Sequence, residues 1–419
     1  MNKYTIITLS LLLLIALDYY CYGAIKSAFQ DSNSKAQKIV TFIYGLLSVY
    51  SIGVLLSIVL LSTEKINPTA RNFIISGLFT NFILKIILSL FLLIEDVSRL
   101  VRWVFAKIIN ATTNNTAQLP ESIERSEFLS QTALVITALP AIAIGYGIIS
   151  GAHDYKIRKK IISLPHLPKA FDGLKIVQIS DIHSGSFFNK TAVKGGIETI
   201  MKQKADVIFF TGDLVNNEAK EMNDWVNVFE KIKAPLGVYS TLGNHDYGDY
   251  QKWDSVAEKK QNLQDLMRIH GNMGWNLLMN EHRMLQQNGE QIAILGIENW
   301  GKGERWPKYG KLDKAHYRTE EASVKLLLSH DPSHWDAQVR TQYPDIDLTF
   351  AGHTHGFQFG IEVGDFRWSP VQYVYKQWAG LYQEQNQRLY VNRGFGYLGF
   401  PGRIGMPPEI TVIELKKGS

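Results

Sequence analysis

Five short polar motifs after residue 180 of this 419-residue sequence contain most of its candidate catalytic side chains. They are Asp181-Ile182-His183, Gly212-Asp213, Gly243-Asn244-His245-Asp246, His330 and Gly352-His353-Thr354-His355. Carboxylate, amide and imidazole donors without thiolates suit Mn, Fe, Zn or Mg, and the sequence does not choose among them. Two adjacent divalent ions can generate hydroxide from bound water and neutralise phosphoryl charge. The motifs therefore predict metal-assisted hydrolysis of a phosphate ester.

Short apolar runs precede each motif and predict the strands that position it. These runs cover residues 174–179, 207–210, 237–242, 325–328 and 348–351, and helices are expected near 191–203 and 219–232. Ligands collect at the carboxyl ends of strands in open α/β sheets. We therefore expect a soluble α/β domain with its site at that edge.

The spacing inside the motifs predicts the direction in which their side chains point. Asp181 and His183 are two residues apart, as are His353 and His355, so an extended backbone would aim both members of each pair to one side. A preceding glycine lets the chain turn sharply beside an ion. Asp213 is the candidate bridging ligand, because one carboxylate can hold two cations.

With these motifs in order, residues 171–418 resemble the calcineurin-like metallophosphoesterase family, whose series is D-x-H, G-D, G-N-H-D/E, H and G-H-x-H. The resemblance implies two mixed β-sheets sandwiched between helices. It also implies a first metal held by Asp181, His183, Asp213 and His355, and a second held by Asp213, Asn244, His330 and His353. By the same resemblance, His245 lies off the metals and protonates the leaving oxygen, and Asp246 orients it.

The C-terminal region narrows the resemblance to membrane-associated bacterial phosphoesterases. It contains Asn392-Arg393-Gly394-Phe395-Gly396, then Arg403 and Pro407-Pro408-Glu409-Ile410. That subgroup usually reads G-H-T-H-G-G-Q, whereas Phe357 stands here in place of the second glycine. This departure alters the local pocket but replaces no ligand.

The N-terminal part predicts an α-helical transmembrane bundle of four helices. Its apolar stretches, at residues 5–25, 39–62, 73–94 and 129–150, each approach the roughly 20 residues that cross a bilayer. Lys85 interrupts the third stretch and is expected to face other helices or a polar cavity. The expected domains are a transmembrane domain over 1–152, a basic linker over 153–170 and the metallophosphoesterase domain over 171–419.

The charge distribution argues against a nucleic-acid partner. Residues 1–152 contain 11 Lys+Arg and 8 Asp+Glu, which leaves 33 and 31 for the rest, so the soluble part is nearly balanced. Positive residues divide evenly between the two sides of the membrane. The dense cluster Lys156-Ile157-Arg158-Lys159-Lys160 after the last span favours the cytoplasmic face, and the resemblance implies a bacterial cell membrane. The lone cysteine, Cys21, excludes an internal disulfide and a multi-thiolate metal site.

The sequence does not identify the substrate. Residues 300–309 and 366–382 combine aromatic and cationic side chains, which either present a lipid-linked phosphate at the membrane surface or cover the edge of the sheet. A membrane-anchored hydrolase of a lipid-linked phosphomonoester, phosphodiester or pyrophosphate is the leading interpretation. A tethered phosphodiesterase for a soluble substrate is the alternative. A non-catalytic metal-binding scaffold is disfavoured, because no ligand is replaced and His245 is intact.

Overall fold

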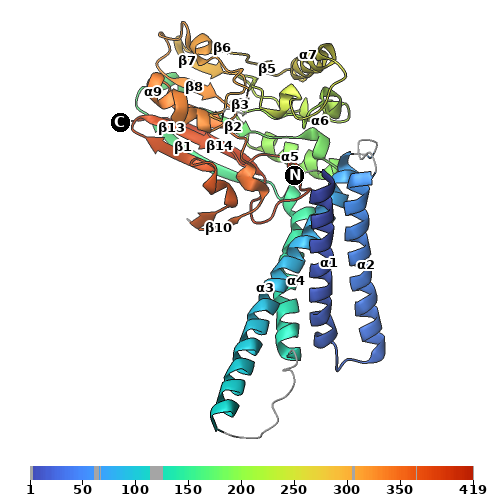
Figure 1. Ribbon diagram of the computed structural model, residues 1–419. Helices are drawn as coiled ribbons and strands as arrows, with labels where there is room; N and C mark the ends of the chain where they lie inside the picture. Colours follow the sequence, from blue (N-terminus) through green and yellow to red (C-terminus); the bar gives the residue numbers. More distant parts are fainter. Residues whose placement is uncertain are drawn as a thin grey trace. The chain divides into compact units, whose positions relative to one another are not determined.

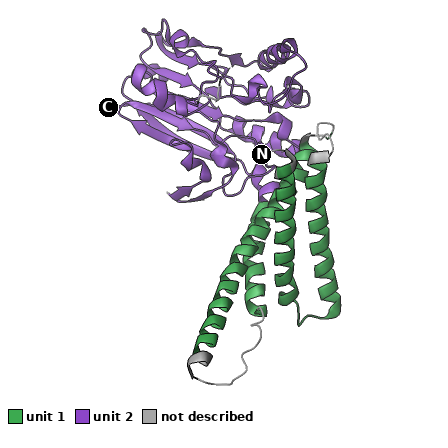
Figure 2. Ribbon diagram, viewed as in Figure 1, with its two compact units in different colours: residues 1–145 green, residues 146–419 purple. Residues whose placement is uncertain are grey.

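The computed structural model describes residues 3–60, 66, 68–113, 126–303, 307–364 and 366–418. Its chain divides into two compact units, Met1–Gly145 and Tyr146–Ser419, coloured separately in Figure 2. The first unit is helical, and the second contains both β-sheets (Figure 1).

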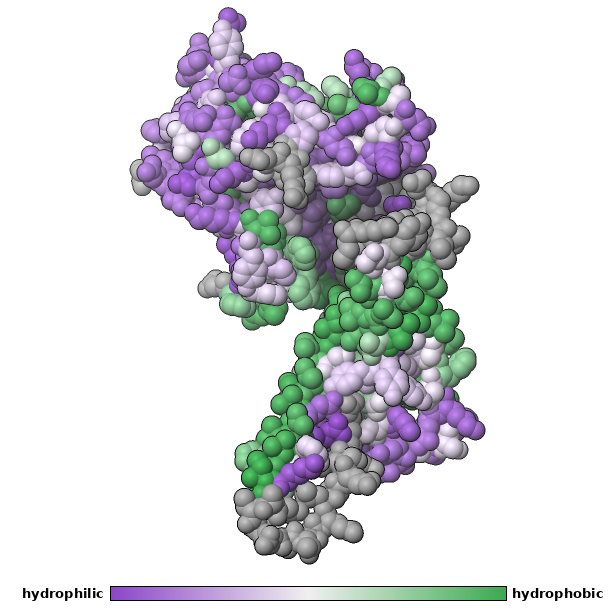
Figure 3. Space-filling model, in the orientation of Figure 1, coloured by the Kyte–Doolittle hydropathy of each residue, from purple (hydrophilic) through white to green (hydrophobic). Residues whose placement is uncertain are grey.

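The four predicted membrane helices are all present in the described residues. They are α1 (Lys3–Ala28), α2 (Ser34–Leu60), α3 (Pro68–Thr113) and α4 (Glu127–Ile149). Each is long and apolar enough to cross a membrane, and hydrophobic side chains cover much of their surface in Figure 3. At 46 residues, α3 is about 70 Å long and extends far beyond the apolar run that predicted it, because helical residues continue past Glu95 and Asp96.

A buried ion pair lies inside the first unit, where Lys85 of α3 meets Asp18 of α1. The Ser48 hydroxyl donates to Asp18 Oδ1 at 2.6 Å, and the Tyr44 hydroxyl donates to the Asp18 carbonyl at 2.8 Å. Charges among apolar helices are stable only when they are paired in this way. The prediction that Lys85 faces other helices is therefore confirmed.

Two six-stranded sheets form the centre of the second unit. The first has the order β1-β14-β2-β3-β4-β5, with bounds Lys156–Leu164, Glu409–Lys417, Lys175–Ile179, Val207–Phe210, Val238–Ser240 and Asn276–Leu277. The second has the order β12-β13-β9-β8-β7-β6, with bounds Gly380–Glu384, Gln387–Val391, Leu348–Ala351, Lys325–Leu328, Glu290–Gly296 and Glu281–Gln287. A separate hairpin pairs β10 (Ile361–Val363) with β11 (Phe366–Trp368).

The strands alternate their side chains between an inner core and two outer cores. Ile176 and Phe209 of the first sheet pack in one cluster with Leu326 and Phe350 of the second, so the two sheets lie face to face. Helices α5 (Lys190–Lys202), α6 (Val226–Phe229) and α7 (Val256–Asn272) cover the first sheet, while α8 (Leu312–His316) covers the second, near α9 (Arg340–Gln342). This arrangement confirms the predicted pair of mixed sheets between helices (Figure 1).

The segment expected to be a basic linker, residues 153–170, instead contains a strand. β1 pairs in parallel with β14 from Lys156↔Glu409 to Leu164↔Lys417. Ile162 and Leu164 are buried, whereas the lysines before them are exposed. Lysine is common on edge strands, where it discourages pairing with another chain. The charges therefore obscured the strand pattern in the sequence.

Candidate metal centre

Each predicted ligand follows the carboxyl end of a strand, as the apolar runs indicated. Asp181 and His183 follow β2, Asp213 follows β3, and Asn244 follows β4. On the second sheet, His330 follows β8, and His353 and His355 follow β9. The structure brings all seven side chains together at one edge of the two sheets, in two groups of donors.

The first group consists of Asp181, His183 and His355, all buried. His183 Nε2 and His355 Nε2 lie 3.0 Å apart, and His355 Nε2 lies 3.3 Å from Asp181 Oδ1. Two nitrogens and a carboxylate oxygen therefore converge on a single point. This is a donor set that a divalent ion accepts.

The second group contains Asp213, His330 and His353, with the Asn244 amide oxygen between the two imidazoles. Asn244 Oδ1 lies 3.1 Å from His330 Nε2 and 2.8 Å from His353 Nδ1. His330 Nε2 lies 3.1 Å from Asp213 Oδ2. A carboxylate oxygen, an amide oxygen and two imidazole nitrogens thus lie close enough together to bind one metal ion.

Asp213 is shared between the two groups. Its Oδ2 atom lies 3.5 Å from His183 Nε2 as well as 3.1 Å from His330 Nε2. Donors bound to one ion at about 2.1 Å, with right-angled or tetrahedral geometry, are separated by roughly 3.0 to 3.4 Å. The observed separations of 2.8 to 3.5 Å match that spacing, so the residues present fit two adjacent divalent ions.

The backbone at these positions is left-handed, not extended as the two-residue spacing had suggested. Five of the seven candidate ligands have positive φ, namely Asp181 (53°), His183 (49°), Asp213 (62°), His353 (72°) and His355 (52°). Each such conformation is sparsely populated and persists only where the surroundings enforce it. The chain therefore turns sharply after each strand to reach the same point.

Two glycines show how closely the motif loops approach one another. Gly212 has φ 96°, and a Cβ there would lie 2.5 Å from the Gly243 backbone nitrogen. A Cβ at Gly352 would overlap the carboxylate of Asp181. Because neither position has room for a side chain, the glycines allow loops from different strands to meet.

Outer hydrogen bonds fix the imidazole rings. His330 Nδ1 lies 2.7 Å from the Thr211 carbonyl, and this contact requires Nδ1 to carry a proton. The lone pair of Nε2 is then available to coordinate a metal. His353 Nε2 lies 2.7 Å from the Tyr375 hydroxyl, and its Nδ1 faces Asn244. The sequence singled out Tyr375 only as one aromatic residue among several, because its distance along the chain hides the contact.

Burial and charge set the protonation of this group. Burial lowers the pKa of His183 to about 3, so its imidazole is neutral. For His330, burial acts in the same direction, but the charge and hydrogen bond of Asp213, the charge of Asp181 and the hydrogen bond to the Thr211 carbonyl together outweigh it and raise the pKa to about 10. An ion bound beside Asp213 would therefore replace a proton on His330.

His245 lies at the edge of the first group. Its backbone N–H donates to Asp213 Oδ1 at 2.9 Å, and its Nδ1 lies 2.8 Å from the Asn216 carbonyl. Its ring centroid lies 5.0 Å from that of His183 and 4.5 Å from that of Tyr250. Since Nδ1 donates its proton to the carbonyl, Nε2 is the nitrogen left for a substrate, and it can give a proton when the ring is in the imidazolium form.

Asp246 does not orient the His245 ring directly, as had been expected. Its carboxylate accepts four backbone N–H bonds, from Asp213 and Gly243 at 2.9 Å, Leu214 at 2.8 Å and Val215 at 3.2 Å. Burial and the charge of Asp213 raise its pKa to about 7, while these donors act in the opposite direction. Asp246 thus holds the loop that ends at Asn216, whose carbonyl aligns His245.

Other histidines have structural positions. His334 is buried, 2.9 Å from Ser329 Oγ through Nδ1, so it supports the strand end before His330 and joins neither donor group. His270 is fully buried against Trp275. Helix α7 places the His270 ring against the core, and the local sequence did not predict this position.

Comparison with known proteins agrees with this geometry. Residues 2–152 match a family model described as a probable calcineurin-like phosphoesterase transmembrane domain, and residues 174–357 match the calcineurin-like phosphoesterase model. The chain therefore belongs to the calcineurin-like metallophosphoesterases, a family of metal-dependent phosphoester hydrolases, and it is a membrane protein.

A bacterial and a vertebrate relative both have names that contain the word metallophosphoesterase. The chain is 32% identical to the metallophosphoesterase YkuE of Bacillus subtilis over 304 residues, which cover 71% of this chain and 99% of that protein. It is 30% identical to a zebrafish (Danio rerio) transmembrane protein with metallophosphoesterase domain over 294 residues, or 68% of this chain. The match spans 62% of the zebrafish protein, just under two thirds of its length.

Proposed function

We propose that this chain hydrolyses a phosphomonoester, phosphodiester or pyrophosphate bond of a lipid-linked substrate. The observation that carries the proposal is the spacing of the seven donors, whose closest atoms lie 2.8 to 3.5 Å apart around a shared Asp213 carboxylate. Without ions, the Nε2 atoms of His183 and His355 would face one another only 3.0 Å apart. The same positions match the metallophosphoesterase motif series in order.

Two divalent ions would be held by these residues, Asp213 serving both. The first site takes Asp181, His183 and His355, and the second takes Asn244, His330 and His353. When bound, such ions lower the pKa of water and neutralise phosphoryl oxygens. Mn, Fe, Zn and Mg all accept this donor set.

His245 supplies the proton for the leaving oxygen in this proposal. The Asn216 carbonyl, 2.8 Å from Nδ1, fixes the ring so that Nε2 is the free nitrogen. Asp246 holds the backbone before Asn216 and thereby keeps the acid in place. Positioned general acids of this kind contribute about 10² to 10⁴ in rate.

A lipid-linked substrate is supported by the rest of the chain. Four candidate spans confine the site to the neighbourhood of a bilayer, where phosphate-bearing lipids are concentrated. Lys156 and the cations after it follow α4 within a few residues, which supports a cytoplasmic site in a bacterial cell membrane. A soluble substrate would gain nothing from four spans beyond a tether.

The test uses full-length protein in nanodiscs, loaded with one metal at a time. Hydrolysis of lipid pyrophosphates and phospholipids is compared with hydrolysis of the matching water-soluble headgroup esters, with D213N as the inactive control. We expect turnover of the lipid form to exceed that of its soluble counterpart. Equal turnover of both would refute the lipid-linked substrate, and a two-metal protein that cleaves neither would refute hydrolysis itself.

The acid is tested by H245A with esters of different leaving groups. Loss of a proton donor should slow alkyl ester hydrolysis by about 10² to 10⁴ and leave nitrophenyl ester hydrolysis much less affected, because nitrophenolate departs without a proton. Metal content should match the wild type. An equal loss for both esters would assign His245 a different role.

A further inference from the structure

The β10–β11 hairpin has one polar and one apolar face. Its register pairs Ile361 with Trp368 and Val363 with Phe366, on the face opposite the central pair Glu362↔Arg367. Ile361, Val363 and Phe366 are 52%, 71% and 62% exposed. In a water-facing hairpin the apolar side normally turns inward, so this orientation is inverted.

Polar contacts hold the hairpin in that orientation. Glu362 accepts hydrogen bonds from Arg158 Nη1 at 3.1 Å and Arg393 Nη2 at 2.9 Å. Arg367 donates to the Ala379 carbonyl at 2.5 Å and lies over the Trp378 ring. Because the polar side is tied to the domain by several contacts, the apolar side is fixed outward.

The apolar surface continues from the hairpin to the metal centre. Phe359 is 42% exposed and packs edge-on against Trp368, and Phe357 is 60% exposed two residues after His355. Phe357 also has φ 60°, a left-handed backbone conformation that side-chain-bearing residues rarely adopt. A strained backbone that carries an exposed phenyl group beside a candidate ligand destabilises the fold, and strain of this kind is typical of functional sites.

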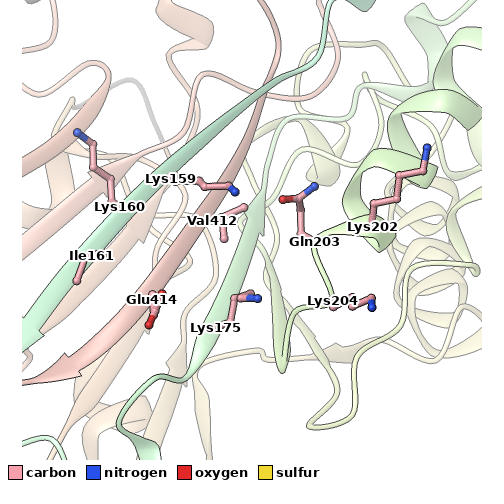
Figure 4. Close-up of a pocket in the computed structure, with 9 residues that line it drawn as sticks. All are labelled: Lys159, Lys160, Ile161, Lys175, Lys202, Gln203, Lys204, Val412 and Glu414. Atoms are coloured by element: carbon pink, nitrogen blue, oxygen red, sulfur yellow. The ribbon is translucent and has the colours of Figure 1, made fainter.

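Lysine side chains on and around β1 line two hollows, one of which also contains the Glu414 carboxylate. Arg158, which binds Glu362, lies on β1 next to Lys159 and Lys160, and these two lysines line a cavity of about 500 Å³ between β1 and the hairpin. They also line a second groove of about 710 Å³ together with Lys175, Lys202 and Lys204 (Figure 4). Within the described residues, none of these five lysines forms an ion pair with a carboxylate.

We propose that the hairpin inserts its apolar face into an anionic phospholipid bilayer, with the lysine groove binding headgroup phosphates. Hydrophobic surface gathers where Figure 1 draws β10 (Figure 3), and an apolar face beside lysines matches the boundary between acyl chains and anionic headgroups. The chain's own spans keep this domain at a bilayer, which makes lipid its most abundant neighbour. Insertion would serve to deliver a lipid phosphoester to the candidate ligands beside Phe357, and in this respect the inference rests on the proposed function.

The test places a polarity-sensitive fluorophore on the hairpin of the full-length protein. In a C21S background, V363C is labelled and compared with V256C, a matched valine that is 86% exposed on α7. In nanodiscs of anionic phospholipid, the label at 363 should shift to the blue and be quenched by lipids carrying a quencher on the acyl chain. The label at 256 should do neither. Equal, water-like emission at both positions would overturn the inference, as would a blue shift that depends on protein concentration.

Charge variants test the lysine groove separately. K159Q/K160Q should weaken the blue shift in anionic nanodiscs more than in neutral ones, whereas K260Q on α7 should change neither. An identical response in both lipids would overturn the headgroup part of the inference. Insertion without hydrolysis would support this inference and refute the proposed function, and hydrolysis of lipid without insertion would do the reverse.

Discussion

Replacement of Asp246 by asparagine tests how the two motif loops are joined. The carboxylate accepts four buried backbone N–H groups, two on each oxygen. An asparagine keeps one of those oxygens and turns an amide NH₂ toward the other two donors. Whichever way the amide lies, two buried N–H groups lose their acceptor.

The magnitude follows from that count. Each buried donor left without an acceptor costs about 1 to 3 kcal/mol, so D246N should lower the free energy of unfolding by roughly 2 to 6 kcal/mol. Because the affected N–H groups belong to Asp213 and its neighbours, metal binding should weaken as well. Fluorescence-monitored urea unfolding of the metal-free, full-length protein in detergent measures the first effect.

Asp206 provides the matched control. Its Oδ2 accepts one backbone N–H, from Lys175 at 2.8 Å, at the opposite end of the strands from the site. An asparagine there can turn its oxygen toward that single donor, so D206N should cost less than about 1 kcal/mol. If D246N and D206N destabilise the protein equally, the claim that Asp246 joins the loops is wrong.

Two further predictions concern a buried histidine and a partly buried tyrosine. Burial lowers the pKa of His270 to about 3, so between that value and about 6.5 the unfolded chain binds a proton that the folded chain does not. The free energy of unfolding should therefore fall as pH falls below about 6.5. H270F should reduce the slope of that decrease by about 1.4 kcal/mol per pH unit when unfolding is measured from pH 6 to pH 4.5. If the wild type and H270F gave parallel plots of unfolding free energy against pH, this prediction would be wrong. Y375F removes the hydroxyl beside His353 Nε2 and should weaken metal binding about 10 to 100-fold in a metal titration, whereas Y373F, at a 77% exposed tyrosine, should not.

The places of the candidate ligands in the fold were predictable, because each of them follows the end of a strand. Apolar runs of four to six residues, each followed by aspartate, asparagine or histidine, placed all seven candidates at the correct edge. The backbone there was not predictable. An Asp-x-His pair in an extended chain and one in a left-handed turn have the same spacing, and only the packing of Gly212 and Gly352 against neighbouring loops selects the turn.

Long-range contacts were also hidden from the sequence. Tyr375 reaches His353 from a loop that carries no motif, and Asn216 reaches His245 from a position 29 residues earlier in the chain. The β1 strand was masked by its lysines, since an edge strand with exposed charge lacks the alternation of a half-buried one. The inverted hairpin likewise depends on Glu362 finding Arg158 and Arg393, whose positions only the fold determines.

Metal stoichiometry tests the central claim most directly. Full-length protein purified in detergent and equilibrated with Mn²⁺ should contain two ions per chain by elemental analysis. H183A/H355A should retain one ion, because the second group keeps Asp213, Asn244, His330 and His353. D213A, which removes the shared carboxylate, should lose both. A wild-type protein with one ion or none, or a D213A protein that still holds two, would contradict a centre built around Asp213.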